Sequence, residues 1–346
     1  MLRTTQLPDP DGPVHGGPDA AGVPALDLST NANACGPYPA AVQTLAGLDA
    51  RHYPDPAYTA LAAQLASWHA VAPARIVLAA SASEFIQRIS TAVALQAGGA
   101  GVWLPAHAYG DYARAARAAG LRRVGDARDA ALLWACEPSS PHGQAERGLA
   151  ARVAALRPNQ ALVLDQAYEP LRLSGQPSLR GAALDRVWRL FTPNKALGLT
   201  GVRAAYAIAP LGADPALLAR LRALAPSWPL GAHGVALLQA WATADAHDWL
   251  AECRAALRVW KARQVDALAT AGWQIEPGDA NFFVAARAFP ASAGGTFDMN
   301  FLLQTLRQRG IKLRDCTSFG LPGWARLAVV APAAQDALIA ALKAPA

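Results

Sequence analysis

The stretch Phe191-Thr-Pro-Asn-Lys-Ala-Leu-Gly-Leu-Thr-Gly-Val-Arg203 carries more chemical information than any other part of this chain. Lys195 lies among small and apolar residues, with the hydroxyl group of Thr192 three positions before it and Arg203 eight positions after it. A lysine that loses its hydration favours the neutral amine, which is the nucleophilic form. A hydroxyl group and a planar guanidinium group together suit a phosphate monoester. The stretch predicts a nucleophilic lysine beside a phosphate site, with a surface lysine on a glycine-rich turn as the alternative.

The composition is that of a globular protein with a large core. Of the 346 residues, 53% are hydrophobic and 16% are charged, so we expect extensive burial that includes a subunit interface. The net charge of +6 is spread thinly, and no basic run alternates with aromatic residues, so no nucleic-acid partner is predicted. Neither the four cysteines nor the seven histidines have metal-ligand spacing, so no metal is predicted. Without an apolar leader or a spanning segment, we expect a cytoplasmic protein with no membrane partner.

The order of the segments favours an α/β fold. From about residue 57 to residue 208, short apolar runs alternate with longer helical patterns, which is typical of a mostly parallel sheet covered by helices on both faces. The remainder is helical at first and then mixes short strands with helices. We predict an N-terminal arm (1–40) that contributes to the small domain, a large cofactor domain (41–245) and a small C-terminal α+β domain (246–346).

Ligands of parallel sheets bind where the strands end, and the residues at those points are unusual here. Ser81, Ala82 and Ser83 follow one predicted strand and open a helix, whose backbone N–H groups suit an anion. A plain helix cap explains the same serines equally well. Tyr109 follows another strand and is placed to stack on a planar ring, although a tyrosine in the core is the alternative. These residues are candidate cofactor contacts.

Asp165 ends the buried run 161–164, and Tyr168 follows three residues later. An aspartate at the end of a strand can pair with a pyridine nitrogen, and a tyrosine near it can reach the phenolic oxygen of the same ring. A helix-capping aspartate and a core tyrosine are the alternatives. Because Asp165 lies one strand before Lys195, the order predicts that Lys195, Asp165 and Tyr168 form the catalytic group around pyridoxal 5'-phosphate. Ser140, in a loop after another strand, is a further candidate for contact with the ring.

Two arginines near the C-terminus are candidate substrate ligands. Arg326 is a charge within the apolar run 325–330, where a charge needs an anionic partner. A substrate carboxylate would satisfy it with bidentate geometry. Arg314 is a second candidate, for a distal phosphate. A salt bridge within the protein is the alternative for either arginine.

Together, these residues resemble the fold-type I pyridoxal-phosphate enzymes of the class I and II aminotransferase superfamily, over nearly the whole chain and in the same order. Asp165-Gln-Ala-Tyr168 is similar to the family's Asp-Glu-Ala-Tyr, and Thr192-Pro-Asn-Lys195 to its Ser-x-x-Lys, with Arg203 at the matching phosphate position. The resemblance implies a large domain with a mostly parallel central sheet, a smaller α+β domain, and an amino-acid-type substrate.

Two branches of the superfamily are similar to this chain. Asn31-Ala-Asn33 and Tyr53-Pro-Asp-Pro56 resemble histidinol-phosphate aminotransferases, which implies a homodimer in which Tyr53 reaches the cofactor phosphate of the neighbouring subunit, and we place Asn33 among the substrate ligands. His15-Gly-Gly17 and the stretch Leu313–Gly323 look most like threonine-phosphate decarboxylases of cobalamin biosynthesis. The second stretch favours threonine-phosphate decarboxylation as the first hypothesis. A histidinol-phosphate-type aminotransferase is the alternative, and a non-catalytic module that binds pyridoxal phosphate is the third.

Three positions depart from the pattern of the family. Ser140 stands where the family's Asn-Pro-x-Asn-Pro-x-Gly has its second asparagine, Gln166 replaces a glutamate, and Cys35 replaces a proline. The loss of the asparagine predicts one weaker hydrogen bond to the cofactor ring. Lys195, Asp165 and the arginines are retained.

Overall fold

The computed structural model describes residues 15–287 and 298–344. The first fourteen residues of the predicted arm therefore lie outside the described part. In chain order the strands are β1 (Leu26–Asp27), β2 (Ile76–Ala79), β3 (Gly101–Trp103), β4 (Arg122–Arg123), β5 (Leu132–Cys136), β6 (Ala161–Asp165), β7 (Trp188–Phe191), β8 (Ala205–Ile208), β9 (Trp273–Glu276), β10 (Phe282–Arg287), β11 (Ile311–Lys312), β12 (Arg314–Asp315) and β13 (Ala325–Ala328). The helices are α1 (Pro39–Ala46), α2 (Thr59–Trp68), α3 (Ala82–Gln96), α4 (Gly110–Ala118), α5 (Leu149–Ala154), α6 (Pro215–Ala223), α7 (Ala232–Trp241), α8 (Ala244–Thr270), α9 (Met299–Gln308) and α10 (Pro332–Lys343).

The larger sheet has seven strands in the order β2-β8-β7-β6-β5-β3-β4. Strand β8 is antiparallel to both of its neighbours, and the pairings from β7 to β4 are parallel. This confirms the predicted mostly parallel sheet. The parallel strands therefore present their carboxyl ends at one edge of the sheet, where ligands of such sheets bind.

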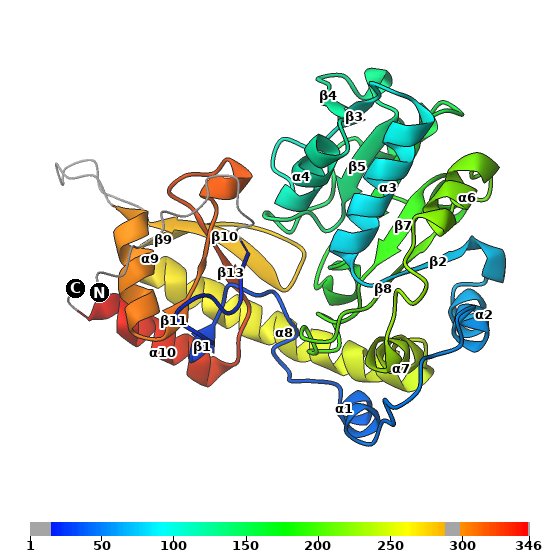
Figure 1. Ribbon diagram of the computed structural model, residues 1–346. Helices are drawn as coiled ribbons and strands as arrows, with labels where there is room; N and C mark the ends of the chain where they lie inside the picture. The colour runs from blue at the N-terminus through cyan, green and yellow to red at the C-terminus, as the bar shows by residue number, and fades with distance from the viewer. Residues whose placement is uncertain (1–14, 288–297, 345–346) are drawn as a thin grey trace, which may run out of the picture.

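Helices cover both faces of this sheet, as Figure 1 shows for α3, α4 and α6 on one side. Along β6, Ala161 and Val163 pack into the cluster formed with these helices, whereas Leu162 and Leu164 pack into a cluster with α5 on the opposite face. Since side chains alternate across a strand, a strand buried on both faces has to be apolar at every position. That is why β5 and β6 were recognisable as uninterrupted apolar runs.

A smaller antiparallel sheet, in the order β12-β13-β10-β9, is formed by the C-terminal part of the chain. Strand β1 from the N-terminal segment pairs with β11, so the described end of the predicted arm joins this smaller unit. Helix α8 extends from the smaller sheet toward α7 in Figure 1 and runs without a break across the predicted boundary at residues 245 and 246. The division into 41–245 and 246–346 therefore stays a proposal.

Three elements of the smaller unit were not predicted from the sequence, namely β1, β9 and α10. Strand β9 has only four residues, with Gln274 exposed and Trp273 buried, so it offers a short pattern. Helix α10 begins with Pro332 in its first turn and is largely alanine and leucine, which favours a helix but gives little contrast between its faces. None of the described helices is long and apolar enough to cross a membrane.

Candidate active site

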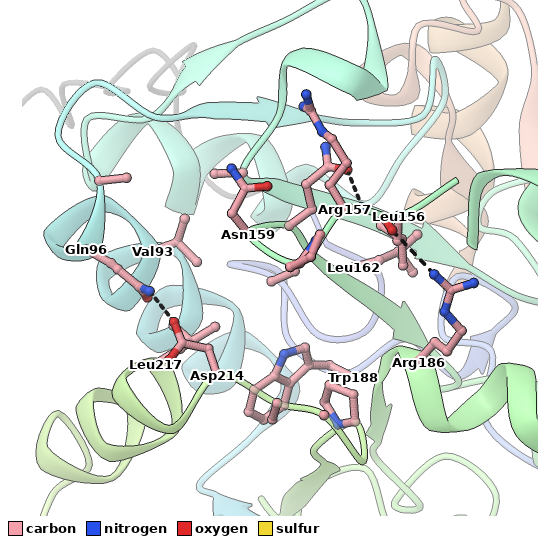
Figure 2. Close-up of a pocket in the computed structure, with 18 residues that line it drawn as sticks. Val93, Gln96, Leu156, Arg157, Asn159, Leu162, Arg186, Trp188, Asp214 and Leu217 are labelled. Carbon is pink, nitrogen blue, oxygen red and sulfur yellow. Dashed lines mark hydrogen bonds between the residues drawn. The ribbon is translucent and has the colours of Figure 1, made fainter. Parts of the chain in front are cut away.

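A cavity of about 520 Å³ lies at the carboxyl ends of the large-sheet strands, between that sheet and residues of the smaller unit. All the predicted site residues except Ser81, Tyr53 and Asn33 line it. A second hollow, of about 620 Å³, lies at the opposite edge of the sheet, where β6 and β7 begin (Figure 2). Trp188 and Leu162 line that second hollow, and Asp214 accepts a hydrogen bond from Gln96 there. Since no predicted site residue lines it, the 520 Å³ cavity is the candidate active site.

Asp165, the last residue of β6, is a buried carboxylate on the cavity wall. Its Oδ2 accepts a 2.7 Å hydrogen bond from the Tyr112 hydroxyl group, and its Oδ1 accepts one of 2.9 Å from the Ala167 N–H. Burial raises the pKa of Asp165, while these two hydrogen bonds and the charge of Lys195 act to lower it. Asp165 is therefore a carboxyl group that is shielded from water and whose charged form accepts two hydrogen bonds.

Lys195 lies in the turn after β7, and its ammonium nitrogen is 5.4 Å from the centre of the Tyr168 ring. The N-terminal segment supports this turn from behind, because the backbone N–H of Asn33 donates to the Lys195 carbonyl (2.9 Å) and Asn33 Nδ2 donates to the Ala196 carbonyl (3.1 Å). Gly198 has a φ of +68°, and a Cβ there would lie 2.7 Å from the carbonyl oxygen of Gly36. The turn therefore needs glycine at this point to pack against the segment.

Asn33 was predicted as a substrate ligand, and the structure places it elsewhere. Its Oδ1 accepts from the Cys35 N–H (3.1 Å), so both ends of the amide are used within the protein. Asn33 does not line the cavity, whereas Asn31 does. Asn31 is 1% exposed, and neither Nδ2 nor Oδ1 of its amide has a hydrogen-bond partner among the residues that the structure describes. Of the two asparagines, Asn31 is the one available to a ligand.

The predicted phosphate contacts gather at the start of α3 and around the Lys195 turn. Ala82 and Ser83 occupy the first turn of α3, where backbone N–H groups lack partners within the helix, and both line the cavity. Ser81 caps this helix instead, since its hydroxyl group accepts a 3.1 Å hydrogen bond from the Glu84 N–H. Thr192 is buried and lines the cavity, and Arg203 lines it while remaining exposed.

The candidate ring contacts also face the cavity. Tyr109 donates to Asp111 (2.8 Å), and its hydroxyl group lies 3.4 Å from that of Ser83. The Tyr168 ring packs edge-on against Phe282, with centroids 4.7 Å apart. Ser140 is buried, and its hydroxyl group accepts a 2.9 Å hydrogen bond from Nη1 of Arg326. The residue that replaces the family's asparagine is thus engaged with a candidate substrate arginine.

Arg314 and Arg326 are both buried, and both line the cavity. They lie on the neighbouring strands β12 and β13, where they occupy paired positions. Arg326 Nη2 donates to the Ser29 carbonyl (3.1 Å), and Arg314 Nη2 donates to Ser318 Oγ (2.7 Å). Burial lowers the pKa of Arg314, and the neighbouring charge of Arg326 acts in the same direction. Two like charges in a shared cavity favour an anionic ligand.

Tyr53 lies away from this cavity. It is 79% exposed and stacks on Trp228, with ring centroids 4.6 Å apart. Its predicted contact with a cofactor phosphate depends on a second copy of the chain and stays a proposal.

Sequence reasoning missed Tyr112, Asn31 and Phe319 as residues of the cavity wall. A signal was present for each of them. Tyr112 lies in the first turn of α4, three positions after the candidate Tyr109 at the N-cap of that helix. Asn31 belongs to the motif from which Asn33 was chosen, and Phe319 lies in the stretch Leu313–Gly323.

This geometry agrees with comparisons to known proteins. The sequence profile of the family described as aminotransferase class I and II matches residues 125–342. The chain belongs to this family. A histidinol-phosphate aminotransferase of Jannaschia sp. (strain CCS1) is 30% identical over 341 residues, which cover 92% of this chain and 91% of that protein.

Two solved structures have the same fold. The histidinol-phosphate aminotransferase of Sinorhizobium meliloti, in complex with pyridoxal-5'-phosphate, has a TM-score of 0.75 at 22% identity, and the match covers 92% of this chain and 90% of that one. The L-threonine-O-3-phosphate decarboxylase of Porphyromonas gingivalis has a TM-score of 0.74 at 20% identity, with 92% and 98% covered. The predicted fold-type I architecture is therefore confirmed.

As a member of this family, the chain is a pyridoxal-phosphate-dependent enzyme of the aminotransferase superfamily. The residues of the cavity fit the cofactor. A buried, hydrogen-bonded carboxylate (Asp165), a lysine (Lys195) and the first turn of α3 face the same space. These groups match the needs of a pyridine nitrogen, an aldehyde carbon and a phosphate, respectively.

Proposed function

We propose that this enzyme transfers the amino group of a phosphorylated amino-acid-type substrate. A relative that is 30% identical to it is named a histidinol-phosphate aminotransferase, which describes a reaction of this kind. One observation carries this proposal: the buried guanidinium groups of Arg314 and Arg326 line the same cavity as Lys195. Guanidinium groups bind phosphate and carboxylate with paired hydrogen bonds. Because an aminotransferase alternates between two substrates, one such site would serve a phosphate in one half of the reaction and a carboxylate in the other.

The residues of the cavity have separate roles in the proposed reaction. Pyridoxal phosphate supplies a ring that withdraws electrons from the substrate carbon. Lys195 removes a proton from that carbon and returns one, as general base and acid at Nζ. Asp165, supported by Tyr112, keeps a negative charge where the pyridine nitrogen needs one. Arg326 and Arg314 fix the substrate by its anionic groups and so orient the bond that breaks.

A second candidate is the loss of carbon dioxide from threonine phosphate, the first hypothesis from the sequence. The relatives that match by sequence favour amino transfer over it. One observation still supports the decarboxylase: Arg314 and Phe319, which line the cavity, belong to the stretch Leu313–Gly323 that resembles those enzymes. The orientation of the substrate carboxylate relative to the cofactor ring decides between the two reactions.

Assays of the purified holoenzyme separate the two candidates. We expect glutamate to form when histidinol phosphate and 2-oxoglutarate are supplied, and no carbon dioxide from O-phospho-L-threonine. Carbon dioxide without glutamate would replace the first candidate by the second. If neither product forms, the proposed substrate class is wrong. An Arg326→Lys variant keeps the charge and loses the paired hydrogen bonds, so it separates the effect of the guanidinium geometry from that of the charge.

We also propose that the enzyme is a homodimer in which the Tyr53 and Trp228 pair contacts a second copy. The support is the exposure of two stacked aromatic side chains, 79% and 42% exposed, which a single subunit leaves in water. Sedimentation equilibrium should give twice the mass of the chain. A Tyr53→Ala variant should weaken cofactor binding, and an unchanged cofactor affinity in a confirmed dimer would contradict the role of Tyr53.

A further inference from the structure

One aromatic ring contacts both candidate substrate arginines. The carbon at the centre of the Arg314 guanidinium lies 4.8 Å from the centre of the Phe319 ring, and that of Arg326 lies 5.6 Å from it. Phe319 is 6% exposed and lines the cavity.

The Phe319 ring offsets part of the repulsion between the two buried guanidinium groups. Two guanidinium groups removed from water repel each other, and the neighbouring charge of Arg326 adds to burial in lowering the pKa of Arg314. An aromatic face carries partial negative charge and attracts a cation within about 6 Å, and the attraction is stronger where water is excluded. Phe319 attracts both cations without adding the full charge of a carboxylate, which would compete with an anionic substrate. The aromatic face therefore favours the charged form of the two guanidinium groups that lie beside it.

Phe319 is itself fixed to the large-domain side of the cavity. It ends a short 3-10 helix (Thr317–Phe319), after which Gly320 turns the chain with a φ of +78°. The carbonyl oxygen of Phe319 lies 2.7 Å from Nδ1 of His107, which is in the loop after β3. Because a carbonyl oxygen can only accept, Nδ1 of His107 carries the hydrogen. The same loop ends at Tyr109, the candidate ring contact, so this hydrogen bond joins the cofactor side of the cavity to the arginine side.

We propose that Phe319, anchored by His107, is a positioning residue that sets the separation of Arg314 and Arg326 and thereby the affinity of the enzyme for phosphorylated substrates. This inference rests on the proposed function, since it assigns the two arginines to the substrate. It predicts that changes at Phe319 act on anion binding and leave cofactor binding as it was.

The test measures the binding of inorganic phosphate to the holoenzyme by calorimetry, so that the cofactor already occupies its own phosphate site. Phe319→Leu keeps much of the volume and removes the aromatic face. We expect it to weaken phosphate binding about tenfold. Phe319→Tyr keeps the face and should stay within about threefold of the wild type. Phe301→Leu is the matched control, because Phe301 is 57% exposed on α9 and lies outside the cavity.

The anchor is tested in the same way. His107→Ala removes the donor to Phe319 and should weaken phosphate binding about fivefold, the cost of one neutral hydrogen bond. His107→Asn places an amide N–H near the position of Nδ1 and should restore most of the affinity. In steady-state assays, both weakening variants should raise KM for the phosphorylated substrate while kcat changes by less than about threefold, because they touch no group at the reacting carbon.

Three results would overturn the inference: equal phosphate affinity in Phe319→Leu and the wild type, a Phe319→Tyr variant as weak as Phe319→Leu, or a wild-type holoenzyme that binds no phosphate at millimolar concentrations. The visible absorbance of the bound cofactor should be the same in all variants, which shows that they are folded. If phosphate binding depends on Phe319 and yet neither phosphorylated substrate is turned over, the positioning of the two arginines by Phe319 stands, and the proposed function fails together with the assignment of the arginines to its substrate.

Discussion

The hydroxyl group of Tyr112 donates a 2.7 Å hydrogen bond to Oδ2 of Asp165. Tyr112 is fully buried, and its ring stacks on Trp134 with centroids 4.3 Å apart and planes 12° apart. The hydroxyl group therefore has a fixed position, set by packing between α4 and the large sheet. Since burial raises the pKa of Asp165 and this hydrogen bond acts against that rise, Tyr112 helps to keep the carboxyl group charged.

Replacing Tyr112 by phenylalanine should weaken cofactor binding with little effect on the fold. The variant keeps the stacking on Trp134 and removes one hydrogen bond to a charged group, which is worth about 1.5–3 kcal/mol. We expect the affinity of the apoenzyme for pyridoxal phosphate to fall by roughly tenfold or more. Titration of the apoenzyme, followed by visible absorbance, measures this. Tyr112→Leu also loses the stacking and should lower the melting temperature, and an unchanged affinity in Tyr112→Phe would contradict the role of the hydroxyl group.

Lys195 should be the amine that links the cofactor. Treatment of the holoenzyme with borohydride should fix the mass of the cofactor on the peptide that contains Lys195, and Lys195→Ala should carry none. Lys261 is the matched control, because it is another partly buried lysine, in α8, whose ammonium group donates to backbone carbonyls of residues 278 and 280. Burial lowers the pKa of Lys261 to about 8, so it is the chief competing amine. Cofactor mass on Lys261 in the wild type would contradict the assignment.

Replacing Asn33 should change the stability of the protein, whereas replacing Asn31 should change the binding of the substrate. Asn33→Ala removes the side-chain hydrogen bonds that support the Lys195 turn, and should lower the melting temperature by about 2–4 °C. Asn31→Ala removes a buried amide that has no hydrogen-bond partner within residues 15–287 and 298–344, so the melting temperature should stay the same or rise. The same variant should raise KM for the phosphorylated substrate. Thermal unfolding and steady-state kinetics measured on both variants separate these effects, and a loss of stability in Asn31→Ala alone would reverse the assignment.

The fold was predictable because its central strands are buried on both faces. Leu132–Cys136 is an apolar run in the sequence and becomes β5 with the same bounds. The order of strand ends then placed Asp165, Lys195 and Tyr109 around one cavity, since the carboxyl ends of parallel strands share an edge. The antiparallel direction of β8 could not be inferred, because its apolar pattern is the same in either direction.

The details of the site depended on three-dimensional contacts that no pattern contains. Asn31 and Asn33 have the same side chain two positions apart, and only the packing of the segment against the Lys195 turn decides which amide faces the ligand. Phe319 is a single aromatic residue in a polar stretch, and its partners Arg326 and His107 come from other parts of the chain. A sequence gives the types of residues but not these long-range neighbours.

His69 is a partly buried histidine outside the candidate active site, and it makes the stability of the protein depend on pH. Its Nε2 lies 2.7 Å from the Tyr206 hydroxyl oxygen, which also accepts a hydrogen bond from Trp241 (2.9 Å). The hydroxyl hydrogen can therefore point to His69 only while that ring nitrogen is unprotonated. Burial, followed by the charges of Arg189 and His247, lowers the pKa of His69 to about 4.

The protein should therefore lose stability as the pH falls below about 6.5, the ordinary pKa of histidine. Between about pH 6.5 and pH 4 the unfolded chain binds a proton at His69 and the folded chain does not. The free energy of unfolding therefore decreases as the pH is lowered through that window. From about pH 7 to pH 5 the contribution is about 2 kcal/mol. Urea unfolding of the wild type and of His69→Phe at both values measures it, since all other titrating groups cancel in the comparison. The variant should lose less stability than the wild type over this interval, and equal losses would show that His69 is protonated in the folded protein.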